Sequence, residues 1–442
     1  MVMIEWYWAM AMMIGLVVSL LFSGFHIAFA FFAANIVGVF VFMRGHLGLA
    51  AMPIEFVYSV SKYAFVPVAL FILMGEILFQ TGVAYRAINA IDHLIKRVPG
   101  RLSVVSIVGG TIFSSLTGST ISNTAIMGSV MLPEMLKRNY HPTIAIGPIM
   151  AVGGIAMLIP PSALAVLLAS LAEGSIKDLL IAGIMPGLLM ATLFFGYVTL
   201  RCWLNPSLAP VSDQDLENDA IENRWRSFLF DVLPLFAIFA VVVGSIVGRI
   251  AAPEEAAALG CITTTIACAF YRKLTFSNLM TALRETAKIN TVIVFIIAGS
   301  LTFSQVLQVS GATSGFLREL QGWELTSLQT MVVMMLVLLF LGAFMDQISM
   351  MLLTLPFFLP LAAAAGIDIL WLLVMMLIAM EISLMSPPFG LLLYVMKGVS
   401  PPSIGIGTIY RAAFPFLLIE LFVLGLLLFW PNLAIWLPSL IR

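Results

Sequence analysis

The sequence predicts an all-α polytopic membrane protein made of two inverted repeats, with about ten transmembrane helices and two re-entrant hairpins. Of its 442 residues, 62% are hydrophobic and only 10% are charged. Apolar runs of about 20 residues, long enough to cross a bilayer, recur along the whole chain. One long hydrophilic stretch divides these runs into two equal sets, and prolines recur at the same spacing in both sets.

The apolar segments follow one another in the same order on both sides of the hydrophilic stretch. We expect the first repeat at residues 1–204, a cytoplasmic linker at 205–227 and the second repeat at 228–442. An acidic residue stands where a signal peptide needs a basic one, so the first run should remain as a span. The segments are 6–22, 26–43, 53–79, 103–136, 143–171 and 179–200, then 228–248, 253–270, 280–306, 328–365, 367–396 and 404–430.

Proline positions test whether the two halves are duplicates. The interval from Pro133 to Pro160 equals the interval from Pro360 to Pro387. The shift in numbering that takes Pro133 to Pro360 therefore also takes Pro160 to Pro387, and we call this shift the repeat offset. It places other apolar segments of the first half onto segments of the second as well, which favours an internal duplication.

Basic residues indicate that the second half is inverted. If segments 103–136 and 328–365 are re-entrant hairpins, each half keeps five true spans, and an odd number reverses the orientation of the second half. Fifteen Lys and Arg residues then face the cytoplasm and six face outward, as the positive-inside rule requires. The first hairpin opens inward, the second opens outward, and both termini lie on the outer side.

A short amphipathic segment lies between span and hairpin in the first half. In Val83–Val98 the apolar residues share one helical face, which predicts either a helix lying along the membrane interface or an ordinary connecting helix. Residues 274–288 are expected to form a second such helix.

The stretch "SSLTGSTISN", residues 114–123, is expected at the tip of the inner hairpin. Hydroxyl, amide and carbonyl oxygens can replace the water shell of Na⁺ without a fixed charge, and half-helix N-termini favour an anion. The alternative is that small residues only allow close helix packing. We assign Na⁺ binding to Ser115, Gly118 and Asn123, and substrate binding to Ser119 and Thr120.

Two proline pairs predict breaks in the spans that follow the hairpins. In "IPPSA", Pro160 and the proline after it remove two backbone donors and leave upstream carbonyls unpaired. These carbonyls and Ser162 are candidate Na⁺ ligands, and Ser386 and Pro387 of "SPPFG" take the same role in the second half. A kink without function is the alternative.

Acidic residues mark the second hairpin and the second break. Asp346 aligns through the repeat offset with the hydroxyl residues of the first tip, and an aspartate within an apolar run is a functional candidate. It either ligates a cation or caps a half-helix. We assign Asp346 to Na⁺, and Gln347 and Glu381 to substrate. Glu76 and Glu420 rank lower because neither lies near a predicted break.

Several function classes are excluded by composition and motifs. The chain has no Ser-His-Asp, zinc-protease or nucleotide-loop pattern, and its four histidines lack ligand spacing, so we expect neither an enzyme nor a cofactor beyond the coupling ion. A net charge of −1 argues against a nucleic-acid partner. No arginine or lysine lies near a predicted break, so helix N-termini and hydroxyls would have to hold an anionic substrate.

Extended stretches of both halves resemble the large membrane subunit of TRAP transporters, the DctM family. They are "SSLTGSTISNTAIMGSVMLPEM", "IPPSALAVLLASLAEGSIKDLLIAGIMPGLL", "FLGAFMDQISMMLLTLPFFLPLAAAAGID" and "SPPFG". The resemblance spans nearly the entire chain. It implies an elevator-type, Na⁺-coupled importer of organic acids such as C4-dicarboxylates, keto acids or sugar acids, in a bacterial inner membrane with both termini periplasmic.

The resemblance also implies partners. They are a small four-span DctQ-like membrane subunit, expected as a separate chain, a periplasmic DctP-like substrate-binding protein, the organic acid and membrane lipid. The chain departs from the family pattern at "MEISLMSPP", where Glu381 is expected to alter substrate choice or to add proton coupling.

Two other hypotheses remain open. A stand-alone Na⁺-coupled symporter of dicarboxylates or other anions has similar inverted hairpins, and its "SNT" signature matches "ISNTAIMG", although the second half has no such counterpart. A membrane scaffold without transport would leave the polar hairpin tips without a ligand.

Overall fold

The fold is entirely helical over the residues that the structure, a computed structural model, describes. These residues are 5–83, 90–91, 95, 98–117, 120–210, 230, 232–387 and 390–441. They hold nineteen α-helices and two short 3-10 helices, Tyr63–Phe65 and Pro206–Leu208. The first half contains α1 (Trp6–Phe22), α2 (Ile27–Phe42), α3 (His46–Val60), α4 (Val66–Thr81), α6 (Arg101–Thr117), α7 (Thr120–Lys137), α8 (Pro142–Ile155), α9 (Ala163–Leu171) and α10 (Ile176–Leu204).

In its described part, the second half contains ten helices, most of which follow the order of the first half, although α15 alone takes the place of α3 and α4. They are α13 (Leu233–Val247), α14 (Pro253–Phe270), α15 (Phe276–Val309), α16 (Ala312–Gln321), α17 (Ser327–Leu341), α18 (Gln347–Ala364), α19 (Ile369–Met385), α20 (Leu391–Val399), α21 (Ile406–Phe429) and α22 (Asn432–Ile441). The repeat offset takes both ends of α7 onto both ends of α18, and the start of α1 onto the start of α13. The helix boundaries therefore repeat with the interval that the prolines indicate.

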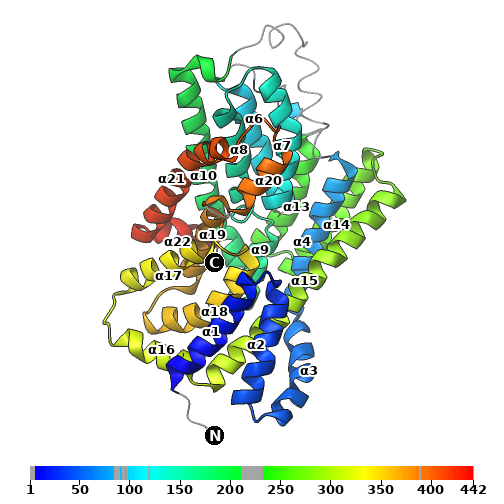
Figure 1. Ribbon diagram of the computed structural model, residues 1–442. Helices are drawn as coiled ribbons and strands as arrows, with labels where there is room; N and C mark the ends of the chain where they lie inside the picture. The colour runs from blue at the N-terminus through cyan, green and yellow to red at the C-terminus, as the bar shows by residue number, and fades with distance from the viewer. Residues whose placement is uncertain are drawn as a thin grey trace.

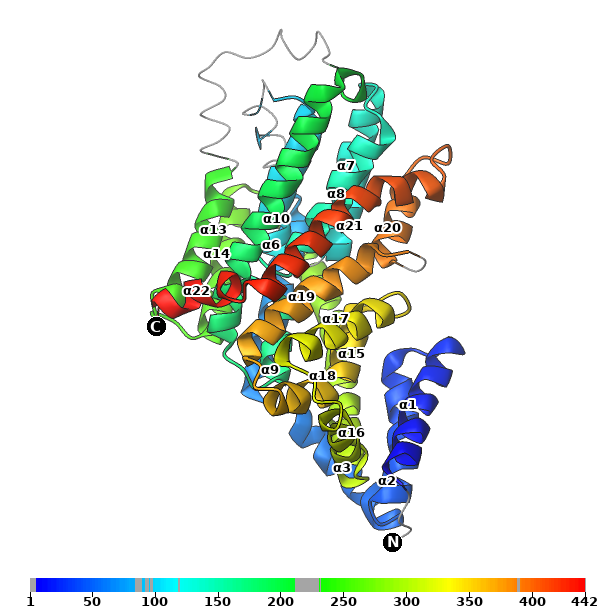
Figure 2. The ribbon, with the colours of Figure 1, turned by 90° about the vertical axis from the view of Figure 1, so that its left-hand side faces the viewer.

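The two hairpins lie in different parts of the molecule. Helices α6 and α7 pack on α8 in the upper part of Figure 1, whereas α17 and α18 lie lower and pack on α19. Figure 2 shows the same separation from another side. The segments predicted as hairpins, 103–136 and 328–365, agree with these helix pairs to within two residues at each end.

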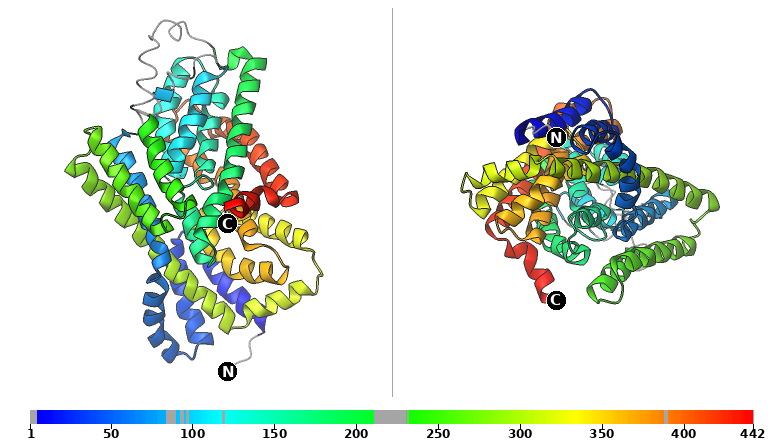
Figure 3. Two further views of the ribbon diagram at one scale, coloured as in Figure 1. Left: turned by 180° about the vertical axis from the view of Figure 1, so that it is seen from behind. Right: turned by 90° about the horizontal axis from the view of Figure 1, so that it is seen from below.

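The longest helix, α15, runs obliquely past α2, α3 and α4, while α14 packs against α4 (Figures 1 and 3). At 34 residues it is about 51 Å long. Together with the helix Tyr63–Thr81, α10, α18 and α21, it has the length and apolar composition needed to cross a membrane.

Two expectations about segment boundaries differ from the structure. The segment 53–79 is divided between α3 and α4, because Pro67 at the start of α4 has no N–H and its ring excludes a continuous preceding turn. The segment 274–288, expected as a separate interfacial helix, forms the first part of the continuous helix α15. Most of the expected amphipathic helix 83–98 and most of the linker 205–227 lie outside the described residues.

Candidate functional site

Four helix N-termini meet at one cavity of about 350 Å³. Its lining includes the first residues of α7, α9, α18 and α20, which are Thr120, Ala163, Gln347 and Leu391. The repeat offset relates α7 to α18, and it relates α9 to α20 to within one position. The cavity thus lies where both hairpin tips face the two half-helices that follow the breaks.

Local sequence explains why helices begin at this cavity. Asp346 caps α18, where its Oδ2 accepts from the backbone N–H groups of Ile348 at 3.1 Å and Ser349 at 3.2 Å. Ser162 caps α9, where its Oγ accepts from the N–H of Ala165 at 3.3 Å. Both side chains satisfy N–H groups that a helix start otherwise leaves unpaired.

The predicted breaks separate helices in both halves. Residues 156–162 connect α8 to α9 and are buried, and they include Pro160 and Ser162. In the second half α19 ends at Met385, and Ser386 and Pro387 follow it before α20 begins. The prolines cannot donate the N–H groups that would continue either helix.

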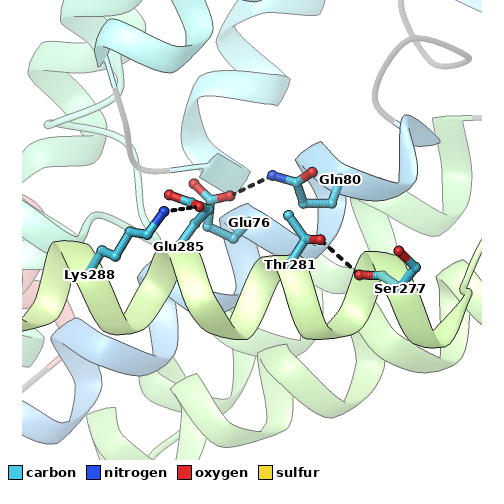
Figure 4. A network of polar contacts seen from close by, with 6 residues as sticks. All are labelled: Glu76, Gln80, Ser277, Thr281, Glu285 and Lys288. Carbon is cyan, nitrogen blue, oxygen red and sulfur yellow. Dashed lines mark hydrogen bonds and ion pairs between the residues drawn. The ribbon is translucent and has the colours of Figure 1, made fainter.

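The opposite wall of the cavity comes from α4 and α15. It is mainly apolar, with Val68 and Ile72 from α4 and Ile293 from α15, but it includes Glu76. Gln80 donates to Glu76 at 3.3 Å, and Glu285 of α15 lies close enough to Glu76 to interact with it electrostatically (Figure 4). The wall is therefore acidic around Glu76.

Electrostatics at the cavity come from helix ends and carboxylates. Within the described residues, the lining holds two carboxylates, Glu76 and Asp346, and no lysine or arginine. The four helix N-termini carry partial positive charge and suit an anion, while the carboxylates suit a cation. The site can therefore receive an anion and a small cation together.

Glu381 lies behind the two hairpin tips and is fully buried. Thr120 donates from Oγ1 to its Oε1 at 3.2 Å. The side chain of Gln347 lies close enough to Glu381 to interact with it electrostatically, while its Nε2 donates to the sulfur of Met157 at 2.8 Å. The first residues of α7 and α18 thus line the cavity on one side and contact Glu381 on the other. Glu381 itself is not part of the cavity lining.

A buried polar chain fixes the α7 tip to its neighbours. Asn123 donates from Nδ2 to the hydroxyl of Ser114 on α6, and Ser114 donates to the carbonyl of Val152 on α8 at 3.0 Å. The Oδ1 of Asn123 is buried and has no hydrogen-bond partner in the described part of the chain. This oxygen is available for a ligand.

The candidate residues from the sequence divide into three groups. Thr120, Asp346 and Gln347 line the cavity. Another group lies in or beside the tips and breaks without lining the cavity; it comprises Asn123, Pro160, Ser162, Glu381, Ser386 and Pro387. Gly118 and Ser119 lie outside the described residues, as does the side chain of Ser115. Which of these residues bind Na⁺ and which bind substrate stays a prediction.

Two acidic residues that the sequence ranks lower, for lying near no predicted break, are close to the breaks in space. Glu76 lines the cavity, and Glu420 on α21 is fully buried beside Gly154, one residue before the end of α8. Both lie far along the chain from the breaks that they face in space. The available signal was their charge within an apolar span, which by itself marks a functional candidate.

A family model and several characterised proteins match the chain. The model described as "Tripartite ATP-independent periplasmic transporter, DctM component" matches residues 14–433. The C4-dicarboxylate TRAP transporter large permease protein DctM of Pseudomonas aeruginosa is 29% identical, covering 88% of this chain and 89% of the relative. The 2,3-diketo-L-gulonate TRAP transporter large permease protein YiaN of Escherichia coli is 29% identical, covering 86% of this chain and 87% of the relative.

A third relative is longer than this chain. The isethionate TRAP transporter permease protein DctMQ of Oleidesulfovibrio alaskensis is 25% identical over 80% of this chain and 57% of its own length. Among solved structures, the YdaH transporter of Alcanivorax borkumensis superposes with a TM-score of 0.61 at 16% identity, covering 89% of this chain and 90% of that one. This likeness concerns the fold.

Proposed function

The chain belongs to the DctM family of tripartite ATP-independent periplasmic transporters, and we propose that its cavity binds the organic acid that it carries. As a member of that family it is a TRAP transporter large permease for organic acids, a multi-pass bacterial membrane protein and not an enzyme. The observation that carries the proposal is the convergence of four helix N-termini on a cavity whose described lining has no basic side chain.

Helix N-termini substitute here for arginine and lysine. Each carries a partial positive charge that favours carboxylate oxygens, and the N–H groups that Asp346 and Ser162 do not cap can donate to them. Broken helices in secondary transporters commonly hold anionic groups in this way. Thr120 and Gln347 add side-chain donors at the tips of α7 and α18, and Ser119 is proposed to do the same.

Na⁺ coupling accounts for the acidic and hydroxyl groups near an anion site. We assign the ion to oxygens at the tips and breaks, where half-helix ends leave carbonyls unpaired. A bound Na⁺ would offset the repulsion between Asp346 and an organic acid in the same cavity. The proposed ligand set is Ser115, Gly118, Asn123, Pro160, Ser162, Asp346, Ser386 and Pro387.

The repeat offset supports an inverted-repeat elevator. Residues 1–204 and 228–442 would be the two repeats, the linker 205–227 would be cytoplasmic and both termini periplasmic. In this arrangement the hairpins and the broken helices move together along the wall formed by α4 and α15. The apolar residues of that wall, with few polar contacts to break, suit a sliding surface.

The transporter is proposed to work with two partners. One is a small DctQ-like membrane subunit, and the other is a periplasmic DctP-like binding protein that delivers the substrate. The tripartite name of the family supports both partners, and the longer relative named DctMQ supports the first. A periplasmic partner would be consistent with the proposed location of the complex in a bacterial inner membrane.

Uptake into proteoliposomes tests the function. The chain is reconstituted with its small subunit and binding protein, and radiolabelled succinate, 2,3-diketo-L-gulonate and isethionate are offered with and without a Na⁺ gradient. Thr120→Val and Gln347→Leu should each lower Na⁺-driven uptake at least tenfold, about 1.4 kcal/mol per lost contact. Thr354→Val is the control, since Thr354 on α18 hydrogen-bonds only to its own helix. Uptake by the chain alone would favour the stand-alone symporter.

A further inference from the structure

Two carboxyl groups from different helices meet behind the cavity. A methyl group placed on Gly154 of α8 would lie 3.1 Å from Oε1 of Glu420 and 3.4 Å from Oε2 of Glu381. Glu381 comes from α19 and Glu420 from α21, and both side chains are 0% exposed. The absence of a side chain at Gly154 leaves the space in which the two carboxyl groups approach each other.

The pair has oxygens without partners. Oε2 of Glu381 and both oxygens of Glu420 have no hydrogen-bond partner among the described residues. Three unpartnered carboxyl oxygens at full burial are costly unless a cation is bound there. The unpartnered oxygens of Glu381 and Glu420 therefore indicate that a positively charged ligand binds to the pair.

The surroundings of the pair supply no counter-charge. Helices α8, α9, α17 and α22 pack against α19 or α21 and carry no titratable side chain in their described residues. The other elements that pack against α19 or α21 do carry titratable groups. Among the described titratable groups, Glu420 is the charged one that interacts with Glu381. The titratable residues of these other elements are Asp346, Asp368, Lys177, Asp178, Tyr197, Arg201, Cys202, Tyr394, Lys397, Tyr410 and Arg411, with Glu134 and Lys137 at the far end of α7.

Glu381 shares its binding partners with the proposed substrate. Thr120 and Gln347 contact Glu381 from behind, and the same two residues line the cavity. An ionised Glu381 and a substrate carboxylate would therefore compete for the side chains of these two residues and repel each other. Neutralising Glu381 removes this repulsion and frees the donors for the substrate.

We propose that the Glu381–Glu420 pair is a proton site coupled to substrate binding, so that the organic acid enters the cavity together with a proton. The proton comes from water and forms an O–H bond on one carboxylate of the pair, where the neighbouring carboxyl oxygen shares it. It leaves to the cytoplasmic water when the substrate is released. The inference rests on the proposed function and adds H⁺ to Na⁺ as a coupling ion.

Infrared difference spectroscopy on the purified full-length protein, comparing acidic with alkaline solution, tests the pair without knowledge of the substrate. A protonated buried carboxyl group has a carbonyl stretch that shifts in D₂O. Wild type should show such a band, Glu381→Gln and Glu420→Gln should each lose or shift it, and Glu134→Gln should keep it, because Glu134 is a partly exposed partner of Arg138. Absence of the band from wild type overturns the proposal. Loss of the band on addition of Na⁺ also overturns it, because Na⁺ would then occupy the pair in place of the proton.

Transport by the reconstituted complex gives the second test, with the three substrates named above as probes. At a fixed Na⁺ gradient, acidifying the outside by one unit should raise the accumulation ratio about tenfold if one proton accompanies each substrate. Glu420→Gln should lose this response. An unchanged pH response in Glu420→Gln refutes the proton site, whereas uptake that ignores the Na⁺ gradient in every variant refutes the proposed Na⁺ coupling instead.

Discussion

Asp346 offers a test that separates a helix cap from an ion ligand. It lines the cavity and also caps α18, accepting from two backbone N–H groups and from the hydroxyl of Ser349. Alanine removes both roles. Asparagine keeps the cap, because Asn and Asp are nearly equal at this position, but it removes the charge.

The structure sets the size of each effect. Loss of an N-cap costs about 0.5–2 kcal/mol, and the three donors on Asp346 place Asp346→Ala near the upper end. Asp346→Asn loses only the interaction of the charge with the helix end, about 0.3–1 kcal/mol. The melting temperature of Asp346→Asn should thus be close to that of wild type, while that of Asp346→Ala should be lower. Both variants should nevertheless weaken Na⁺ binding at least tenfold if the carboxylate is a ligand.

Asp368 provides the matched control. It is an exposed aspartate that caps α19, accepting from the N–H of Trp371 at 3.0 Å, and it does not line the cavity. The assay is thermal unfolding of the purified protein over a Na⁺ titration, followed by Na⁺-driven uptake. Asp368→Asn and Asp368→Ala should repeat the stability pattern and leave the Na⁺ response intact. Near-normal Na⁺ response and uptake in Asp346→Asn would show that Asp346 is only a cap.

Two further predictions concern buried positions with matched controls. Gly183→Ala should lower the melting temperature by a destabilisation of about 1–3 kcal/mol and impair uptake, because its new Cβ would lie 2.2 Å from the carbonyl oxygen of Leu158 in the first break. Gly196→Ala on the same helix meets nothing within 4 Å and should be neutral or stabilising; equal effects would contradict the packing. Asn123→Ala and Asn35→Ala each remove a fully buried amide that donates a hydrogen bond, so both should reduce thermal stability. Only Asn123→Ala should also weaken Na⁺-dependent uptake, and a Na⁺ response unchanged from wild type would place the ion elsewhere.

Local signals explain the parts of the fold that the sequence could predict. Two adjacent prolines remove two N–H groups, so the breaks at Pro160 and Pro387 follow from the local sequence, whereas the single prolines Pro133 and Pro360 lie inside α7 and α18. The hairpins followed from apolar length and from the offset between the halves. The division between α3 and α4 has a local signal as well, in Pro67, but a hydropathy pattern does not register it because proline interrupts hydrogen bonding without adding charge.

Contacts between helices distant in sequence explain what could not be predicted. The charge of Glu420 within an apolar span marks it as a candidate, but the residues near it in the sequence do not show which groups it meets, because that depends on the packing of α21 against α8. That packing depends in turn on Gly147, where a Cβ would lie 2.4 Å from the ring of Phe416. A close helix contact of this kind needs a small residue on one side, and a single glycine leaves little periodic signal.

The repeat offset carries more information than the helix boundaries alone. It relates Gly154 to Glu381, and these two residues are in contact: a Cβ on Gly154 would lie 3.6 Å from the Cβ of Glu381. It also relates Thr120 to Gln347: Thr120 hydrogen-bonds to Glu381, and Gln347 lies close enough to interact with it electrostatically.

In the proposed inverted-repeat architecture, equivalent residues meet in this way only near the axis that would relate the two repeats, where each faces its own counterpart. A long side chain on one side of such an axis then requires a short one on the other. Glu381 is therefore tolerated because its counterpart is glycine.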